Sequence, residues 1–189
     1  VREGKKHLIL TDRGVKENTA SIPMALAIGA INSRLSDVGI RGFATTPESL
    51  IRELTLGMQH LQLEKNSLKS IDTITRFSGI WTTPPLDHDA YDLLCVSWLD
   101  EVLFQSEVQD RFLVDLVGKI SREHGKLQFS GQVSYVECTD VVKSTEIKAV
   151  TTHALSFFKL KDKQISSHPQ IDIPVIEGPG WVGDVYFDI

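Results

Sequence analysis

One stretch of the chain decides the fold: residues 46–61, with the sequence TPESLIRELTLGMQHL. Thr46 offers a hydroxyl that can cap a helix, and Pro47 suits the first helical position because no amide hydrogen is left unpaired there. Apolar residues then recur every three or four positions, the spacing of one helix face. They are Leu50, Leu54, Met58 and Leu61, with Ile51 widening the stripe. The stretch therefore predicts an amphipathic helix.

A second amphipathic helix is predicted from about residue 89 to 106. Its apolar residues fall at i, i+3, i+4, i+7 and i+11. They are Tyr91, Leu94, Cys95, Trp98 and Val102. We expect Trp98 in the core, and we expect Asp100 and Glu101, opposite this stripe, to meet solvent or a partner.

The remaining segments are typical of strands, because they are rich in β-branched and aromatic residues. They cover residues 38–44, 70–81, 112–120, 126–137, 146–160 and 182–187. A hairpin turn is predicted at 124–126, and a long loop at 162–180. Since strands follow strands, the sequence predicts an α+β fold. We expect a single domain in which the two helices pack on a mostly antiparallel β-sheet.

Composition narrows the class of protein. The 189 residues are 41% hydrophobic and 24% charged, which is typical of an ordinary folded chain. A net charge of -5 disfavours direct nucleic-acid binding, which usually needs a basic surface. The longest apolar run, at 22–31, is about half of the ~20 residues that a membrane span needs. Cys95 and Cys138 form no CxxC pair, so we expect reduced thiols and a cytoplasmic protein.

Common catalytic motifs are missing from the sequence. It has no phosphate-binding GxxxxGK[ST] or GxGxxG, no HExxH, no GxSxG and no Cys/His cluster with zinc spacing. The six histidines are scattered at 7, 60, 88, 124, 153 and 168. The sequence therefore favours a protein that is not an enzyme.

Three separated blocks, taken in order, resemble the archease family. Residues 36–43 (SDVGIRGF) with the helix start at 46–50 are similar to the family's "HTADVGIRAYG" opening. Residues 93–104 (LLCVSWLDEVLF) are similar to "LLVEWLNELLY", and residues 145–153 (TEIKAVTTH) to "TEVKAVTYH". The chain ends on YFDI, where the family ends on "FDI". The resemblance covers about residues 35–189.

The chain also departs from the family pattern. Arg34 and Leu35 stand where the family has His and Thr, and the loop at 162–180 is longer. About 33 residues precede the opening motif. We therefore predict an N-terminal extension at 1–33 and an archease-like domain at 34–189.

The resemblance implies a metal site. Its ligands would be the carboxylates of Asp37 and Asp188 and the terminal carboxylate of Ile189. An oxygen-only set suits Ca²⁺ first, with Mg²⁺ or Mn²⁺ as alternatives, rather than zinc. Lys148 and, more weakly, His153 are candidates for supporting this site or facing a partner. Lys148 lies beside Glu146 in the same predicted strand, and the alternative role for Lys148 is a cross-strand ion pair.

The resemblance also implies a function. Archeases assist the RtcB-type RNA-splicing ligase, which joins tRNA halves and needs GTP and Mn²⁺. We therefore expect a metal-binding activator that promotes guanylylation and multiple turnover of this RNA ligase, without stable nucleic-acid binding of its own and without a membrane. Two other classes stay open at this point: a small metal-dependent hydrolase, and a chaperone-like interaction module.

Overall fold

The computed structural model describes residues 7–11, 37–64, 67, 74–87, 89–168, 173 and 175–189. The helices are α1 (Pro47–Gln62), α3 (Tyr91–Glu107) and a 3₁₀ turn at Cys138–Asp140. The first strands are β1 (His7–Thr11), β2 (Asp37–Ala44), β3 (Phe77–Thr82), β4 (Leu86–Asp87) and β5 (Arg111–Glu123). They are followed by β6 (Lys126–Glu137), β7 (Ala149–Leu160), β8 (Ile165–Ser166), β9 (Ile176–Glu177) and β10 (Gly180–Asp188).

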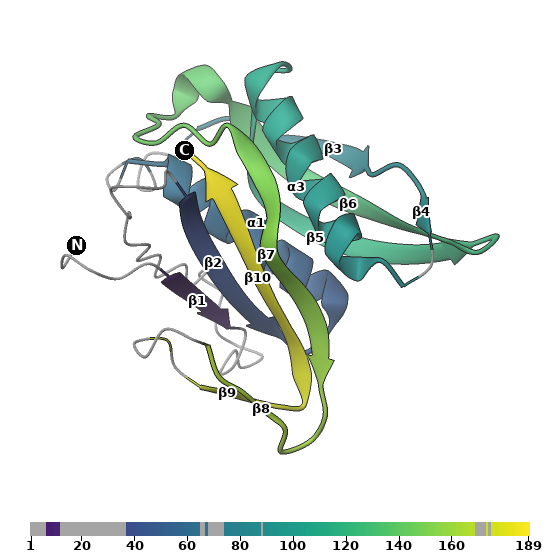
Figure 1. Ribbon diagram of the computed structural model, residues 1–189. Coiled ribbons are helices and arrows are strands. Elements are labelled where there is room, and N and C mark those ends of the chain that lie inside the picture. The colour runs from purple at the N-terminus through teal and green to yellow at the C-terminus, as the bar shows by residue number, and fades with distance from the viewer. Residues whose placement is uncertain are drawn as a thin grey trace, which may run out of the picture.

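The two long helices lie between two β-sheets (Figure 1). The first sheet has the strand order β1-β2-β10-β7, and all its pairings are antiparallel except β1 with β2. In the second sheet β6 pairs with β3, β4 and β5, in each case antiparallel. The α+β prediction, with two helices and mostly antiparallel strands, is confirmed. The described strands form two four-stranded sheets, which cover both sides of the helical layer, and a separate two-stranded pair of β8 with β9.

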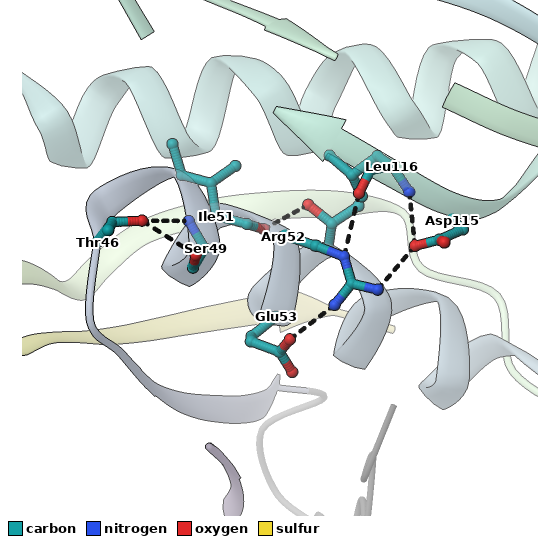
Figure 2. Close-up of polar contacts among 8 residues, drawn as sticks. Thr46, Ser49, Ile51, Arg52, Glu53, Asp115 and Leu116 are labelled. Atoms are coloured by element: carbon teal, nitrogen blue, oxygen red, sulfur yellow. Dashed lines mark hydrogen bonds and ion pairs between the residues drawn. The ribbon is translucent and has the colours of Figure 1, made fainter. Parts of the chain in front are cut away.

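The start of α1 is as predicted. Thr46 is the N-cap, and its hydroxyl accepts a hydrogen bond from the amide of Ser49 at 3.1 Å (Figure 2). The predicted apolar stripe is buried against the core, apart from half-buried Leu61. Gly42 of β2 lets the helix approach closely, because an added Cβ there would lie 2.8 Å from Leu50 Cδ1.

Helix α3 runs from Tyr91 to Glu107 and is apolar on more than one face. It contacts β7 of the first sheet and β5, β6 and β3 of the second. Trp98 is fully buried, as expected, and its ring meets that of Phe129 edge-on at 4.6 Å. A helix between two sheets needs a wider apolar surface than one packed on a single sheet. The single stripe predicted from the sequence was therefore too narrow for α3.

Side chains of α1 protect the edge strand β5. Arg52 Nε donates to the carbonyl of Leu116 at 3.0 Å, and Gln59 Nε2 donates to that of Leu113 at 3.1 Å. The same guanidinium forms ion pairs with Glu53 at 2.9 Å and Asp115 at 2.8 Å (Figure 2). These contacts satisfy edge carbonyls that would otherwise be open to pairing with another strand.

The hairpin turn between β5 and β6 lies where the sequence predicts it. His124 and Gly125 both have positive φ, 47° and 84°. Positive φ at both central residues is the feature of the two-residue turn that matches strand twist. The predicted strand 126–137 has the observed bounds of β6.

Two predicted segments differ from the structure. The predicted loop at 162–180 contains the short antiparallel pair β8–β9, in which Ile165 lies opposite Glu177. Ile176 of this pair is buried in a cluster with Phe43 and Val182. The strand predicted at 70–81 is observed only as β3, and its residues 70–73 lie outside the described residues.

The N-terminal segment contributes β1 to the first sheet. Its residues pair in parallel with β2, from His7 opposite Gly39 to Thr11 opposite Phe43. The other residues of 1–33, and Arg34, lie outside the described residues. The division into an extension at 1–33 and a domain at 34–189 therefore stays a prediction.

Candidate functional site

The two aspartates predicted as metal ligands lie on neighbouring strands. Pairing of β2 with β10 is regular, from Ala44 opposite Trp181 to Asp37 opposite Asp188. Ala149 of β7 lies on the other side of Asp188. The register therefore brings together, at one end of the first sheet, two positions that are far apart in the sequence (Figure 1).

Asp188 lies on the face of the sheet that is turned away from the helices. Val185 and Phe187 of β10 belong to the main core around α1 and α3. Side chains alternate along a strand, so Asp188 lies on the opposite face, where it is half-buried.

Lys148 lies beside this pair of positions. Its backbone amide donates to the carbonyl of Asp188 at 2.8 Å. Its ammonium Nζ donates to an oxygen of Ile189 at 3.1 Å. The Ile189 side chain packs against the main core, which holds this oxygen in place. The structure thus brings Lys148 together with Asp188 and Ile189.

His153 does not join this group. It lies in the part of β7 between Thr151, opposite Tyr186, and Ser156, opposite Asp184. The register between β7 and β10 is irregular there, and Ala154 has a φ of 53°. His153 is exposed and lies away from the pairing of Asp188 with Ala149.

The donor set at this end of the sheet fits a hard divalent cation. Asp37, Asp188 and Ile189 would offer only carboxylate oxygens, which suit Ca²⁺, Mg²⁺ or Mn²⁺. The Lys148 ammonium against Ile189 shows that this oxygen already attracts a cation. Within the described ranges, no cluster of three His, Cys, Asp or Glu side chains could hold a metal. A metal here therefore depends on Asp37 and the terminal carboxylate acting together with Asp188.

A buried polar group that the sequence analysis missed lies on the same face. Arg41 forms an ion pair with Asp184, its cross-strand partner, at 3.7 Å. Ser156 donates to Asp184 Oδ2 at 2.7 Å, and Arg41 donates to the hydroxyl of Ser166 at 2.5 Å. Arg41 Nε and Asp184 Oδ1 are buried without a hydrogen-bond partner. The sequence signal was a charged residue within each of two apolar strands, but nothing in it showed that the two strands pair.

Two titratable groups flank this buried pair. Burial lowers the pKa of His168, and burial likewise raises the pKa of the Tyr186 hydroxyl. In both cases burial disfavours the charged form. The negative charge of Asp184 raises the pKa of both groups, and the positive charge of Arg41 lowers it.

The two cysteines play no part in the candidate site. Both are free thiols, Cys95 buried and Cys138 half-buried. Burial raises the pKa of each, which makes the reactive thiolate scarce.

Asp100 is exposed, as expected, and Glu101 accepts a hydrogen bond from Gln105 at 2.8 Å. Among the helices that the structure describes, none is long and apolar enough to cross a membrane.

Comparison with known families decides the classification. The model of the Archease protein family matches residues 32–189, which is most of the chain. The chain belongs to the archease family. Archeases form a non-catalytic accessory family, so membership supports an accessory role in RNA processing.

A comparison with solved structures concerns the fold. The archease fold is shared with the solution structure of protein 1598 of Methanobacterium thermoautotrophicum, at 18% identity and a TM-score of 0.52. That match covers 82% of this archease and 93% of the other chain. A comparison with curated proteins found no match. The model of the glutamate synthase central domain matches residues 1–46, a segment too short to assign a function.

Proposed function

We propose that this archease is a metal-binding accessory factor that activates an RtcB-type RNA-splicing ligase, by promoting its guanylylation and its multiple turnover. The proposal is carried by the pairing of Asp37 with Asp188 at the end of the first sheet. A family resemblance alone would not require these two positions to meet. Their meeting supports a shared role.

Asp37, Asp188 and the Ile189 carboxylate would hold the divalent cation. When bound, the cation would supply positive charge at an exposed end of the sheet. Strand pairing and side-chain packing would position these ligands. Pairing of β2 with β10 sets the two aspartates opposite each other, and the packing of the Ile189 side chain fixes the terminal carboxylate.

Docking at the ligase is supported by charge. The chain carries a net charge of -5, which is complementary to a cleft that binds Mn²⁺ and a nucleotide. A divalent cation held at the exposed end of the sheet would help to order or exchange cations in that cleft. We further propose that the protein acts in the cytoplasm, where its two thiols would stay reduced.

A metal-dependent hydrolase is less well supported by the same geometry. Hydrolysis needs a general base within hydrogen-bond reach of the attacking water. His153 lies away from the paired aspartates, and Lys148 acts there as a hydrogen-bond donor. Neither predicted supporting residue is thus placed to act as the base.

The proposed function is tested by RNA ligation under multiple turnover. The assay would use RNA with 3′-phosphate and 5′-hydroxyl ends, GTP, Mn²⁺ and an RtcB-type ligase in amounts far below the RNA. We expect repeated rounds of ligation only when this archease is present, and we expect the ligase to copurify with it. A ligase that turns over equally well without it, and does not copurify with it, would favour an interaction module. RNA cleavage by the archease alone would favour a hydrolase.

Extending the chain beyond Ile189 is expected to weaken metal binding. A short Gly-Ser extension converts the terminal carboxylate into a neutral amide and removes one charged ligand from the set. Calorimetric titration with Ca²⁺ and with Mn²⁺ measures the loss. The control carries the same extension before Val1. Equal affinity for the parent and the C-terminally extended protein would show that Ile189 is not a ligand.

A further inference from the structure

The ammonium of Lys148 donates to an oxygen of Ile189, the residue whose terminal carboxylate would be a metal ligand. Two contacts fix the lysine: its amide on the Asp188 carbonyl at 2.8 Å, and Nζ on the Ile189 oxygen at 3.1 Å. The first contact belongs to the backbone and would remain if the side chain moved. The second is made by an exposed side chain and can be exchanged for another cation.

We propose that the Lys148 ammonium and the divalent cation compete for the Ile189 carboxylate, so that Lys148 sets the affinity of the metal site. This inference rests on the proposed function, because it takes the metal site as given. Both competitors are cations, and they repel each other at the short range that a shared carboxylate imposes. The site is exposed, so salt weakens this repulsion without removing it.

Other described basic groups are placed elsewhere. Arg41 is held by Asp184 and Ser166, and it lies two side-chain positions along β2 from Asp37. Lys159 lies towards the other end of β7, opposite Trp181. Among the described cations, Lys148 is therefore the one placed to act on the Ile189 carboxylate.

The competition has a reciprocal consequence. If the ammonium lowers metal affinity by some factor, the bound metal weakens the contact between Lys148 and Ile189 by the same factor. Loading the site with metal therefore releases the ammonium from Ile189. The lysine is then more often available to an anionic group of the partner ligase in the metal-bound state than in the metal-free state.

Calcium titration of side-chain variants tests the proposal. We expect Lys148→Met to bind Ca²⁺ about fivefold more tightly than the parent, because it removes a like charge and keeps the length of the side chain. Lys148→Arg retains the charge and should bind Ca²⁺ like the parent. The matched control is Lys159→Met, which removes one positive charge from the same strand at its far end. It should leave the affinity unchanged.

The outcomes separate this inference from the proposed function. A parent protein that binds neither Ca²⁺ nor Mn²⁺ refutes the metal site, and the competition with it. A parent that binds Ca²⁺, with Lys148→Met binding equally or more weakly, refutes only the competition. A gain in Ca²⁺ affinity that Lys148→Met and Lys159→Met share would reflect the change in net charge. That result would also refute the competition. A thermal melt of each variant checks that it folds like the parent.

Discussion

Replacing Asp184 with alanine is expected to lower the free energy of unfolding by about 3–5 kcal/mol. Asp184 is the partner of Arg41, whose side chain is only 2% exposed. Without the carboxylate, the guanidinium stays buried and uncompensated, which is far more costly than losing an exposed ion pair. Ser156 would also lose the acceptor of its hydrogen bond.

The loss of stability in Asp184→Ala comes from leaving one buried charge without its partner. Removing both charges should therefore cost much less stability. The double variant Arg41→Met, Asp184→Leu replaces the pair with apolar side chains of similar size. Such replacements are often neutral or stabilising. We therefore expect the double variant to recover most of the stability that Asp184→Ala loses.

Urea unfolding of the three proteins measures these differences. The control is Asp162→Ala, which removes an exposed aspartate from the turn after β7 and should change the unfolding free energy by no more than about 0.5 kcal/mol. If Asp184→Ala proves as mild as Asp162→Ala, the buried guanidinium must have another source of compensation. A double variant less stable than Asp184→Ala would show that the ion pair itself stabilises the fold.

Local signals in the sequence were enough to predict both helices. The cap at Thr46 and the spacing of Leu50, Leu54 and Met58 all lie within four turns of α1. The hairpin at His124 is equally local, because a two-residue turn fixes the register of the strands on either side. These features depend on residues that are close together in the chain, and the structure confirms them.

Pairings between distant segments could not be predicted. Periodicity shows that a segment is a strand without showing which strand it joins, so the division into two sheets remained hidden. Arg41 and Asp184 illustrate this limit: each would be an unfavourable charge in its own strand, and only their pairing makes burial acceptable. The parallel pairing of β1 with β2 was hidden for the same reason.

The candidate site was predicted from the family resemblance rather than from spacing. The structure adds the register that sets Asp37 opposite Asp188, and the contact of Lys148 with Ile189. His153, which follows Thr151 in the same predicted strand, was ranked below Lys148 as a candidate. It lies four residues along β7 from Ala149, the partner of Asp188, and so away from the paired aspartates. The roles of both residues at the site stay predictions.

Asp37→Ala and Asp188→Ala are each expected to abolish stimulation of the ligase while leaving the fold largely intact. Carboxylates gathered without a cation repel one another, so deleting one should cost little stability and can even relieve repulsion. The loss of a ligand should instead remove metal binding, and with it any effect on ligation. The measurements are multiple-turnover ligation, Ca²⁺ titration and a thermal melt.

Trp98→Ala is the contrasting variant, because it damages the fold without touching the site. Its side chain is fully buried, packs edge-on against Phe129 and donates from Nε1 to the Thr55 hydroxyl at 2.9 Å. Truncation leaves a large cavity between the helices and the second sheet, and should cost about 3–5 kcal/mol. Below its lowered melting temperature, the folded fraction should still bind Ca²⁺.

If both aspartate variants melt like the parent and still stimulate ligation, the site assigned to Asp37 and Asp188 is wrong. If they melt as early as Trp98→Ala, the two aspartates serve the fold instead of the metal.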